Sequence, residues 1–143
     1  MIVEKNDYIV IKDKALKILI IDDSLLDRKL LMSLLTKSGV KNEILQAPDG
    51  DEGLKILSEN YQNIALILLD WQMPKLDGIG FMKAVVNVKE VASIPIVMIT
   101  ASGSEENKRL AREVNPHLAG YLIKPFNSEK LLELITPFVQ REG

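Results

Sequence analysis

Polar residues whose chemistry suits phosphoryl transfer follow the apolar runs of this 143-residue chain. They are Asp22, Asp23, Asp70, Thr100 and Lys124, and each comes at the end of such a run. A carboxylate can attack phosphorus, a lysine can stabilise the charge on the phosphoryl oxygens, and a hydroxyl can donate a hydrogen bond to one of them. We therefore expect Asp70 to accept a phosphoryl group, with Thr100 and Lys124 beside it.

Three of these residues also suggest a metal site. Asp22, Asp23 and Asp70 would repel one another at one edge of a sheet unless a cation lay among them. Ligands that are all oxygen suit Mg²⁺, which makes magnesium the expected cofactor. Taken singly, each residue has an ordinary explanation as a turn former, a helix cap or a solvated charge. Their coincidence at the ends of successive apolar runs is what favours a site.

The elements that would position these residues alternate along the chain. The expected strands cover residues 16–23, 42–47, 63–70, 94–100 and 120–124, and the expected helices cover residues 24–39, 48–60, 78–90, 104–114 and 128–140. Five strands alternating with five helices predict an α/β fold with a parallel sheet, helices on both faces and right-handed crossovers. Ligands of such sheets bind beyond the carboxyl ends of the strands, where the polar residues would gather.

Local signals support several helix boundaries. Ser24 is the expected N-cap of the first helix, and Gly39 is its expected stop. The leucines of this helix repeat at helical spacing, with Leu26, Leu30 and Leu34 on one face and Leu31 and Leu35 beside them. Pro137 lies late in the last expected helix and should kink or end it.

Composition excludes several classes of protein. Hydrophobic residues make up 47% of the chain, which is enough for one domain with a sizeable core. The net charge of −2 and the lack of a basic cluster argue against direct nucleic-acid binding and against attachment to an anionic membrane. The first residues form no long apolar run, and the chain has no cysteine. We expect a soluble, cytoplasmic protein.

Four segments resemble, in order and spacing, the signatures of the receiver domain of two-component response regulators. They are "IIDDS", "LLDWQMPKLDG", "IPIVMITA" and "GYLIKPF". The chain is also similar to the single-domain, chemotaxis-type members of this family. The resemblance implies a flavodoxin-like, doubly wound sheet with strand order 2-1-3-4-5. We expect residues 1–16 to be an N-terminal arm or extra strand and residues 17–143 to form the receiver domain.

The resemblance implies a role for each matching residue. Asp23 would be the more direct metal ligand, Asp22 would act partly through water, and Asp70 would be both ligand and phosphoacceptor. The backbone carbonyl of Gln72 would complete the ligands that the protein supplies. Thr100 and Lys124 would bind the phosphoryl oxygens, and the bond between Lys124 and Pro125 would be cis.

The family also implies a switch and two kinds of protein partner. Phosphorylation would draw Thr100 toward Asp70, and Tyr121 would turn into the space that Thr100 leaves. The changed face would combine the fourth helix, the fifth strand and the fifth helix, including Lys108, Arg109, Arg112 and Tyr121. The single histidine, His117, lies in a loop in the wrong part of the domain to be the donor, so a partner histidine kinase or phosphotransfer protein would supply the phosphoryl group. A downstream effector protein would read the changed face.

Three other functions remain as alternatives. A receiver-like scaffold that is never phosphorylated would keep the fold without the reaction. A haloacid-dehalogenase-type phosphatase would also use an aspartyl nucleophile and Mg²⁺, but it requires an acid two residues after the nucleophile, where this chain has Gln72. A flavin or nucleotide binder would require a glycine-rich phosphate loop, which neither "DGIG" nor "ASGS" provides. We expect a phosphoacceptor rather than an enzyme acting on other molecules.

Overall fold

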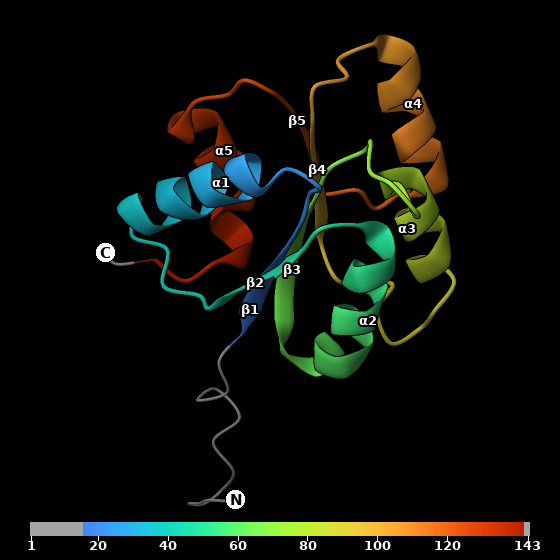
Figure 1. Cartoon of the computed structure of the whole chain (residues 1–143), viewed down its shortest axis with the longest axis horizontal. Coiled ribbons are helices and arrows are strands. Elements are labelled where there is room, and N and C mark those ends of the chain that lie inside the picture. Colours follow the sequence, from blue (N-terminus) through green and yellow to red (C-terminus); the bar gives the residue numbers. More distant parts are fainter. Residues whose placement is uncertain (1–15, 142–143) are drawn as a thin grey trace, which may run out of the picture.

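The computed structural model describes residues 16–141 and contains one parallel sheet in the order β2-β1-β3-β4-β5 (Figure 1). Its strands are β1 (Lys17–Ile21), β2 (Ile44–Ala47), β3 (Ile64–Leu69), β4 (Ile96–Thr100) and β5 (Gly120–Ile123). The predicted parallel α/β sheet and its flavodoxin-like strand order are confirmed. The predicted arm, residues 1–16, lies outside the described residues except for Leu16.

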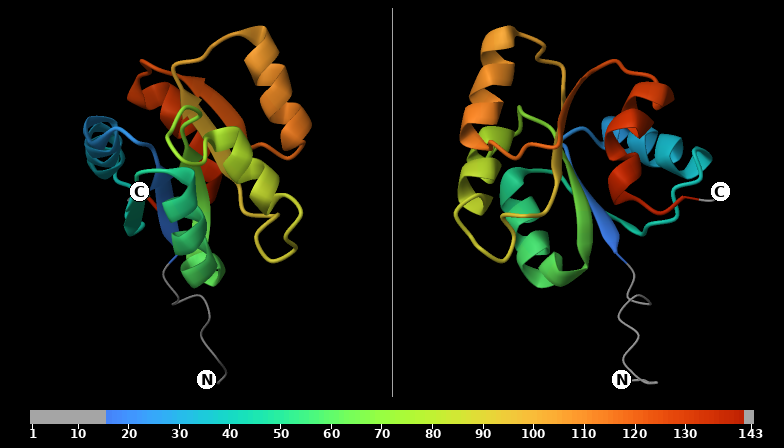
Figure 2. Two further views of the ribbon diagram at one scale, coloured as in Figure 1. Left: turned by 45° about the vertical axis from the view of Figure 1, so that its right-hand side comes forward. Right: turned by 180° about the vertical axis from the view of Figure 1, so that it is seen from behind.

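Helices cover both faces of the sheet. They are α1 (Leu25–Lys37), α2 (Gly50–Asn60), α3 (Gly78–Val85), α4 (Glu105–Val114) and α5 (Ser128–Ile135), with short 3₁₀ turns η2 (Tyr61–Asn63) and η3 (Thr136–Phe138). Helices α1 and α5 lie on one face, and α2, α3 and α4 lie on the other (Figures 1 and 2). No helix among residues 16–141 is both long enough and apolar enough to cross a membrane.

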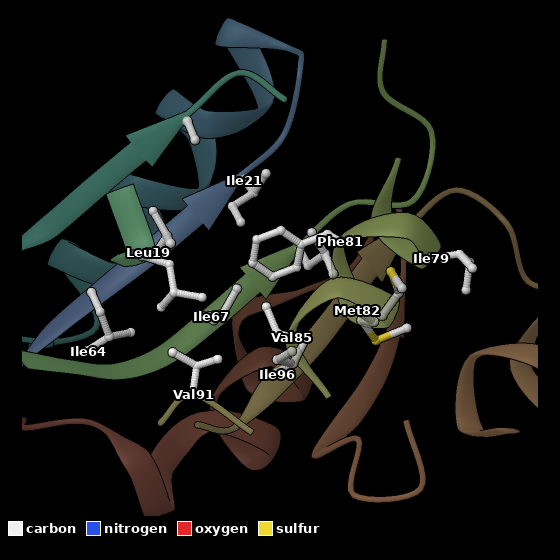
Figure 3. Close-up of a cluster of buried hydrophobic side chains, with 14 of the residues drawn as sticks. Leu19, Ile21, Ile64, Ile67, Ile79, Phe81, Met82, Val85, Val91 and Ile96 are labelled. Carbon is white, nitrogen blue, oxygen red and sulfur yellow. The ribbon is translucent and has the colours of Figure 1, made fainter. Parts of the chain in front are cut away.

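The strands separate two apolar clusters because successive side chains of a strand point to opposite faces. In β1, Leu19 and Ile21 belong to the cluster under α2, α3 and α4, whereas Ile18 and Ile20 belong to the cluster under α1 and α5. Figure 3 shows the first cluster, in which Phe81 projects from α3 toward the strands. Each apolar side chain buried in these clusters contributes roughly 1.5–3 kcal/mol to the stability of the fold. The sheet that carries the site is therefore held rigidly from both sides.

The expected signals at the ends of α1 and α5 are confirmed. The Ser24 side chain accepts a hydrogen bond from the Asp27 amide at 3.1 Å, which caps α1. Gly39 follows the end of α1 with φ of 85°, a left-handed conformation that costs glycine little. Helix α5 ends at Ile135, and Pro137 lies in the 3₁₀ turn that follows.

Two expectations about helices need correction. The third helix does not extend over residues 78–90, because α3 ends at Val85 and continues as turns that place Val91 in the core. Valine and asparagine at 86–88 are weak helix formers, which suits this early end. The leucine stripe of α1 is also wider than its buried face: Leu31 and Leu35 are buried, but Leu26 and Leu30 are 66% and 59% exposed.

Candidate functional site

The backbone hydrogen-bond ladder of the sheet continues one residue past three of its strands and so fixes three of the predicted site residues. The amide of Asp22 donates to the Ala47 carbonyl at 3.1 Å, and the amide of Asp70 donates to the Ile21 carbonyl at 2.9 Å. The amide of Lys124 donates to the Thr100 carbonyl at 2.9 Å. These residues therefore start from rigid backbone at the carboxyl edge of the sheet.

Three carboxylates converge at this edge. Asp22, Asp23 and Asp70 each offer an oxygen, and these three atoms lie within 4.8 Å of one another. Asp22 is buried, Asp70 is partly buried and Asp23 is exposed. The Ser24 amide donates to Asp22 Oδ1 at 2.9 Å, and the Trp71 amide donates to Asp70 Oδ1 at 2.7 Å. Three oxygen donors at this spacing fit a small divalent cation such as Mg²⁺, with one side open to solvent.

The ammonium of Lys124 reaches across the sheet edge into the same cluster. Its Nζ lies 2.8 Å from Asp22 Oδ2, 2.9 Å from Asp27 Oδ2 and 3.4 Å from Asp70 Oδ2. Asp27 lies in the first turn of α1 and was not among the predicted site residues, so its contact with Lys124 was missed. The sequence did contain a signal for this contact. Asp27 lies in the first turn of a helix that begins at the same edge of the sheet as Asp22 and Asp23.

Burial and neighbouring charges shift two pKa values at the site. Burial raises the pKa of Asp70 above its ordinary value of 3.8, and the negative charge of Asp22 raises it further, while Lys124 and the Trp71 amide act in the opposite direction. Burial lowers the pKa of Lys124, but hydrogen bonds to Asp22 and Asp27 and the charge of Asp70 together raise it well above its usual range. Lys124 therefore remains charged at neutral pH, and a cation bound among these carboxylates would favour the ionised form of Asp70.

The residues on the β4 and β5 side connect the site to the surface. Thr100 is 2% exposed, and its Oγ1 accepts a hydrogen bond from the Ser102 amide at 3.3 Å. The half-buried Tyr121 donates its hydroxyl to the Ser102 carbonyl at 2.7 Å, and burial raises the pKa of this phenol. The Asn107 side chain in α4 donates to Ser102 Oγ. Ser102 thus contacts both Thr100 and Tyr121, the two residues of the expected switch.

Gln72 lies, exposed, in the loop that joins β3 to α3. Two hydrogen bonds hold this loop, one from the Gly78 amide to the Trp71 carbonyl at 2.7 Å and one from the Gly50 amide to the Leu76 carbonyl at 3.0 Å. A Cβ at position 78 would lie 2.3 Å from the Asp70 carbonyl oxygen, so only glycine allows the loop to fold back this tightly. The bond between Lys124 and Pro125 is cis, as expected.

Two of the three basic residues of the expected readout face are accessible. Arg109 and Arg112 are exposed on α4, and the charge of Arg112 acts to lower the pKa of Tyr121. Lys108 pairs with Glu105 at 3.3 Å within the same helix. His117 is exposed in the loop between α4 and β5.

A groove of about 700 Å³ adjoins the acidic cluster on the α1 side. Apolar side chains from α1 and from the segment after β5 line most of it, including Leu30, Leu34 and Phe126. Asp22, Asp27 and Lys124 also line it. The site is therefore continuous with a largely apolar surface.

Comparisons with known proteins agree with this geometry. A family model, described as the response regulator receiver domain, matches residues 18–136. The probable chemotaxis protein CheY of Rhizobium etli is 36% identical over 118 residues, which is 82% of this chain and 88% of the relative.

Solved structures have the same fold. Chemotaxis response regulator CheY4 of Vibrio cholerae matches with a TM-score of 0.75 and 32% identity, covering 87% of this chain and 98% of its own. A chain of the CheX–CheY–BeF₃–Mg²⁺ complex from Borrelia burgdorferi matches with a TM-score of 0.76 and 29% identity, covering 87% and 90%. Since the family model matches most of the chain and includes all the predicted site residues, this protein belongs to the response regulator receiver domain family.

Proposed function

We propose that this receiver accepts a phosphoryl group on Asp70 from a phosphohistidine of a partner histidine kinase or phosphotransfer protein, in a reaction that requires Mg²⁺. The convergence of Asp22, Asp23 and Asp70 within 4.8 Å, with the Lys124 ammonium among them, is the observation that carries the proposal. The phosphorylated form would then bind an effector protein. The domain acts on its own side chain, so we do not propose an enzyme with a separate substrate.

Asp22, Asp23 and Asp70 would hold the cation, together with the backbone carbonyl of Gln72. When bound, Mg²⁺ would offset the charge of the carboxylates and of the incoming phosphoryl oxygens. The raised pKa of Asp70 supports this assignment, because it reflects a buried negative charge that lacks full compensation. The solved CheX–CheY complex from Borrelia burgdorferi contains BeF₃ and Mg²⁺, which is consistent with a similar site here.

In the proposed reaction, a carboxylate oxygen of Asp70 attacks phosphorus. The bond between the donor's imidazole nitrogen and phosphorus breaks, the imidazole leaves with the electron pair, and a bond between Asp70 and phosphorus forms. Lys124 stabilises the charge on the phosphoryl oxygens, and the Thr100 hydroxyl donates to one of them. Later attack by water returns the free carboxylate and releases inorganic phosphate.

The donor protein would approach along the groove beside α1. Leu26 and Leu30 on this helix are 66% and 59% exposed, and the groove that Leu30 lines also contains Lys124. A donor that covered these leucines would bury apolar surface and could present its histidine to Asp70. Lys124 lines the groove and its ammonium lies 3.4 Å from Asp70 Oδ2, which favours the donor over the effector as the occupant of the groove.

The effector would bind the opposite side of the site. This face would consist of Tyr121 together with Lys108, Arg109 and Arg112 on α4. Its conformation would depend on the loop after Thr100. The hydrogen bond from the Tyr121 hydroxyl to Ser102, two residues after Thr100, supports this coupling. A shift of a few kcal/mol in the relative stability of two states of this loop is enough to reverse their populations.

Trp71 provides a test, because its amide contacts the Asp70 carboxylate and it is the only tryptophan. Its fluorescence would be followed while Mg²⁺ and then acetyl phosphate or beryllofluoride are added, and intact mass would report phosphoryl transfer. We expect a Mg²⁺-dependent response in the wild type and no phosphoryl transfer in Asp70→Asn. The matched control Asp51→Asn, an exposed aspartate in the first turn of α2, should behave as the wild type.

Other outcomes would favour the other functions. A wild-type protein that binds neither Mg²⁺ nor beryllofluoride would contradict the proposal and favour a scaffold. Steady turnover of added phosphomonoesters would instead favour a phosphatase.

A further inference from the structure

The contacts of Lys124 are unequal, and the weakest is with the proposed phosphoacceptor. Its Nζ lies 2.8 Å from Asp22 and 2.9 Å from Asp27, but 3.4 Å from Asp70. Charge-assisted hydrogen bonds are strongest at about 2.7–2.9 Å, so the two shorter contacts dominate the position of the ammonium. Lys124 is thus drawn away from Asp70 and toward the start of α1.

Asp27 is well fixed for this role. Its amide donates to the Ser24 side chain at 3.1 Å, which caps α1 at the turn that carries Asp27. The neighbouring Arg28 donates from Nη1 to the Asp22 carbonyl at 2.6 Å and from Nε to the Gln46 side chain at 3.0 Å. The first turn of α1 is therefore tied to the loop after β1 and to the end of β2. A counter-ion held on such a rigid turn can restrain a long, flexible lysine side chain.

Asp27 also differs from the other carboxylates around Lys124. Its side chain is 38% exposed, compared with 8% for Asp22 and 11% for Asp70. It is not a member of the group of three that could hold the cation. When Asp22, Asp23 and Asp70 bind a cation, the negative charge of Asp27 would therefore stay at the solvent-exposed entrance, or mouth, of the site.

We propose that Asp27 is a positioning residue that restrains Lys124 and slows the acceptance of phosphoryl groups by Asp70. This inference rests on the proposed function of Asp70. For Lys124 to stabilise the phosphoryl oxygens, its ammonium must shift toward Asp70, and the contact with Asp27 opposes that shift. The charge of Asp27 also repels an anionic donor at the mouth of the site. The rate of phosphorylation is thereby set partly by a side chain that touches neither metal nor phosphorus.

The test compares rates of phosphorylation by acetyl phosphate at saturating Mg²⁺, measured through Trp71 fluorescence and intact mass. Asp27→Asn and Asp27→Ala should react faster than the wild type by about fivefold, the size expected for weakening one partly exposed charged contact. Asp27→Glu, which retains the carboxylate, should return the rate toward that of the wild type. Asp51→Asn removes the same charge from the first turn of α2 and should leave the rate unchanged.

Salt separates a direct contact from a general charge effect. Part of the faster rate of Asp27→Asn should persist at about 1 M salt, because salt screens charges more than about 3 Å apart more strongly than it weakens a pair in hydrogen-bond contact. Loss of the acceleration in high salt would show only long-range repulsion and would overturn the restraint. A merely structural role for Asp27 would lower the melting temperature and would not accelerate the reaction.

The possible failures can be told apart. If the wild type accepts a phosphoryl group but both Asp27→Asn and Asp27→Ala react at the same rate or more slowly, the restraint is wrong and the proposed function stands. An equal acceleration in Asp51→Asn or Asp27→Glu would also overturn the restraint. If the wild type itself never accepts a phosphoryl group, the proposed function fails and this inference fails with it.

Discussion

At the scale of single residues, the site holds the Asp70 carboxylate in an environment that disfavours its negative charge. Asp70 is partly buried next to Asp22, and both effects raise its pKa above the ordinary value of 3.8. A raised pKa means that the folded protein tolerates the ionised carboxylate less well than the unfolded chain does. The acceptor is therefore maintained at a cost to stability, as is common for groups whose chemistry depends on their environment.

This cost predicts that Asp70→Asn stabilises the metal-free protein at pH 7. Asp70 favours the folded state below its ordinary pKa of 3.8, and this contribution is lost as the pH rises through the higher pKa of the folded state. At pH 7 the negative charge of Asp70 is present in the folded state, so its removal stabilises the folded protein. Urea unfolding in EDTA would measure the change, with Asp51→Asn as the exposed control. A less stable Asp70→Asn protein at pH 7 would contradict the prediction.

At the scale of elements, the loop after β3 is held by the start of α2. The Gly50 amide donates to the Leu76 carbonyl at 3.0 Å, and Lys75 in the same loop adopts a left-handed φ of 68°. The Lys75 ammonium lies 3.9 Å from Oδ2 of Asp49, the N-cap residue of α2. The loop that carries the proposed Gln72 ligand joins β3 to α3. It is therefore positioned by α2, the helix that connects β2 to β3.

Gly50→Ala should lower the free energy of unfolding by roughly 2–3 kcal/mol. The new Cβ would lie 2.4 Å from the Leu76 carbonyl oxygen, which is backbone and has little freedom to move away. The gain in helix propensity from alanine, about 1 kcal/mol, is too small to offset this overlap. Chemical denaturation would measure the loss.

Gly103→Ala is the matched control for this prediction. Its new Cβ would approach only the far end of the Ile123 side chain, at 2.9 Å, and that end can rotate away. We expect a change within about 0.5 kcal/mol. Equal losses in the two variants would show that overlap with the loop is not what matters at Gly50.

At the scale of the whole molecule, one buried side chain joins the two ends of the described chain. Asn42 donates from Nδ2 to the Leu16 carbonyl at 2.8 Å, and its Oδ1 accepts from the Gln140 amide at 2.7 Å. The Lys41 amide also donates to the Gln140 carbonyl at 2.7 Å. The start of β1, the loop before β2 and the segment after α5 are thus fastened together, at the end of β1 opposite the site (Figure 1).

Asn42→Ala should therefore destabilise the protein by roughly 1–3 kcal/mol, because it removes both hydrogen bonds of a buried side chain. Asn87→Ala, at an exposed position after α3, should have almost no effect. Hydrogen exchange would localise the change, with faster exchange expected at the Gln140 amide. Unchanged protection of that amide would contradict the proposed fastening.

The sequence by itself determined the order and type of the elements, because every strand of this sheet except β2 is a short apolar run followed by a polar residue. It also predicted that Asp22, Asp70 and Lys124 would meet, since parallel strands present their carboxyl ends at one edge. The cap at Ser24 and the end of α5 near Pro137 followed from local backbone chemistry alone.

Only the tertiary structure decided which side chains share a contact across elements. The pairing of Lys124 with Asp27, 97 residues apart, depends on how α1 lies against the end of β5. The same packing leaves Leu26 and Leu30 exposed although they share the helical spacing of the buried Leu31 and Leu35. Helical spacing defines the apolar residues of a helix, but the neighbouring elements decide how much of that surface they cover.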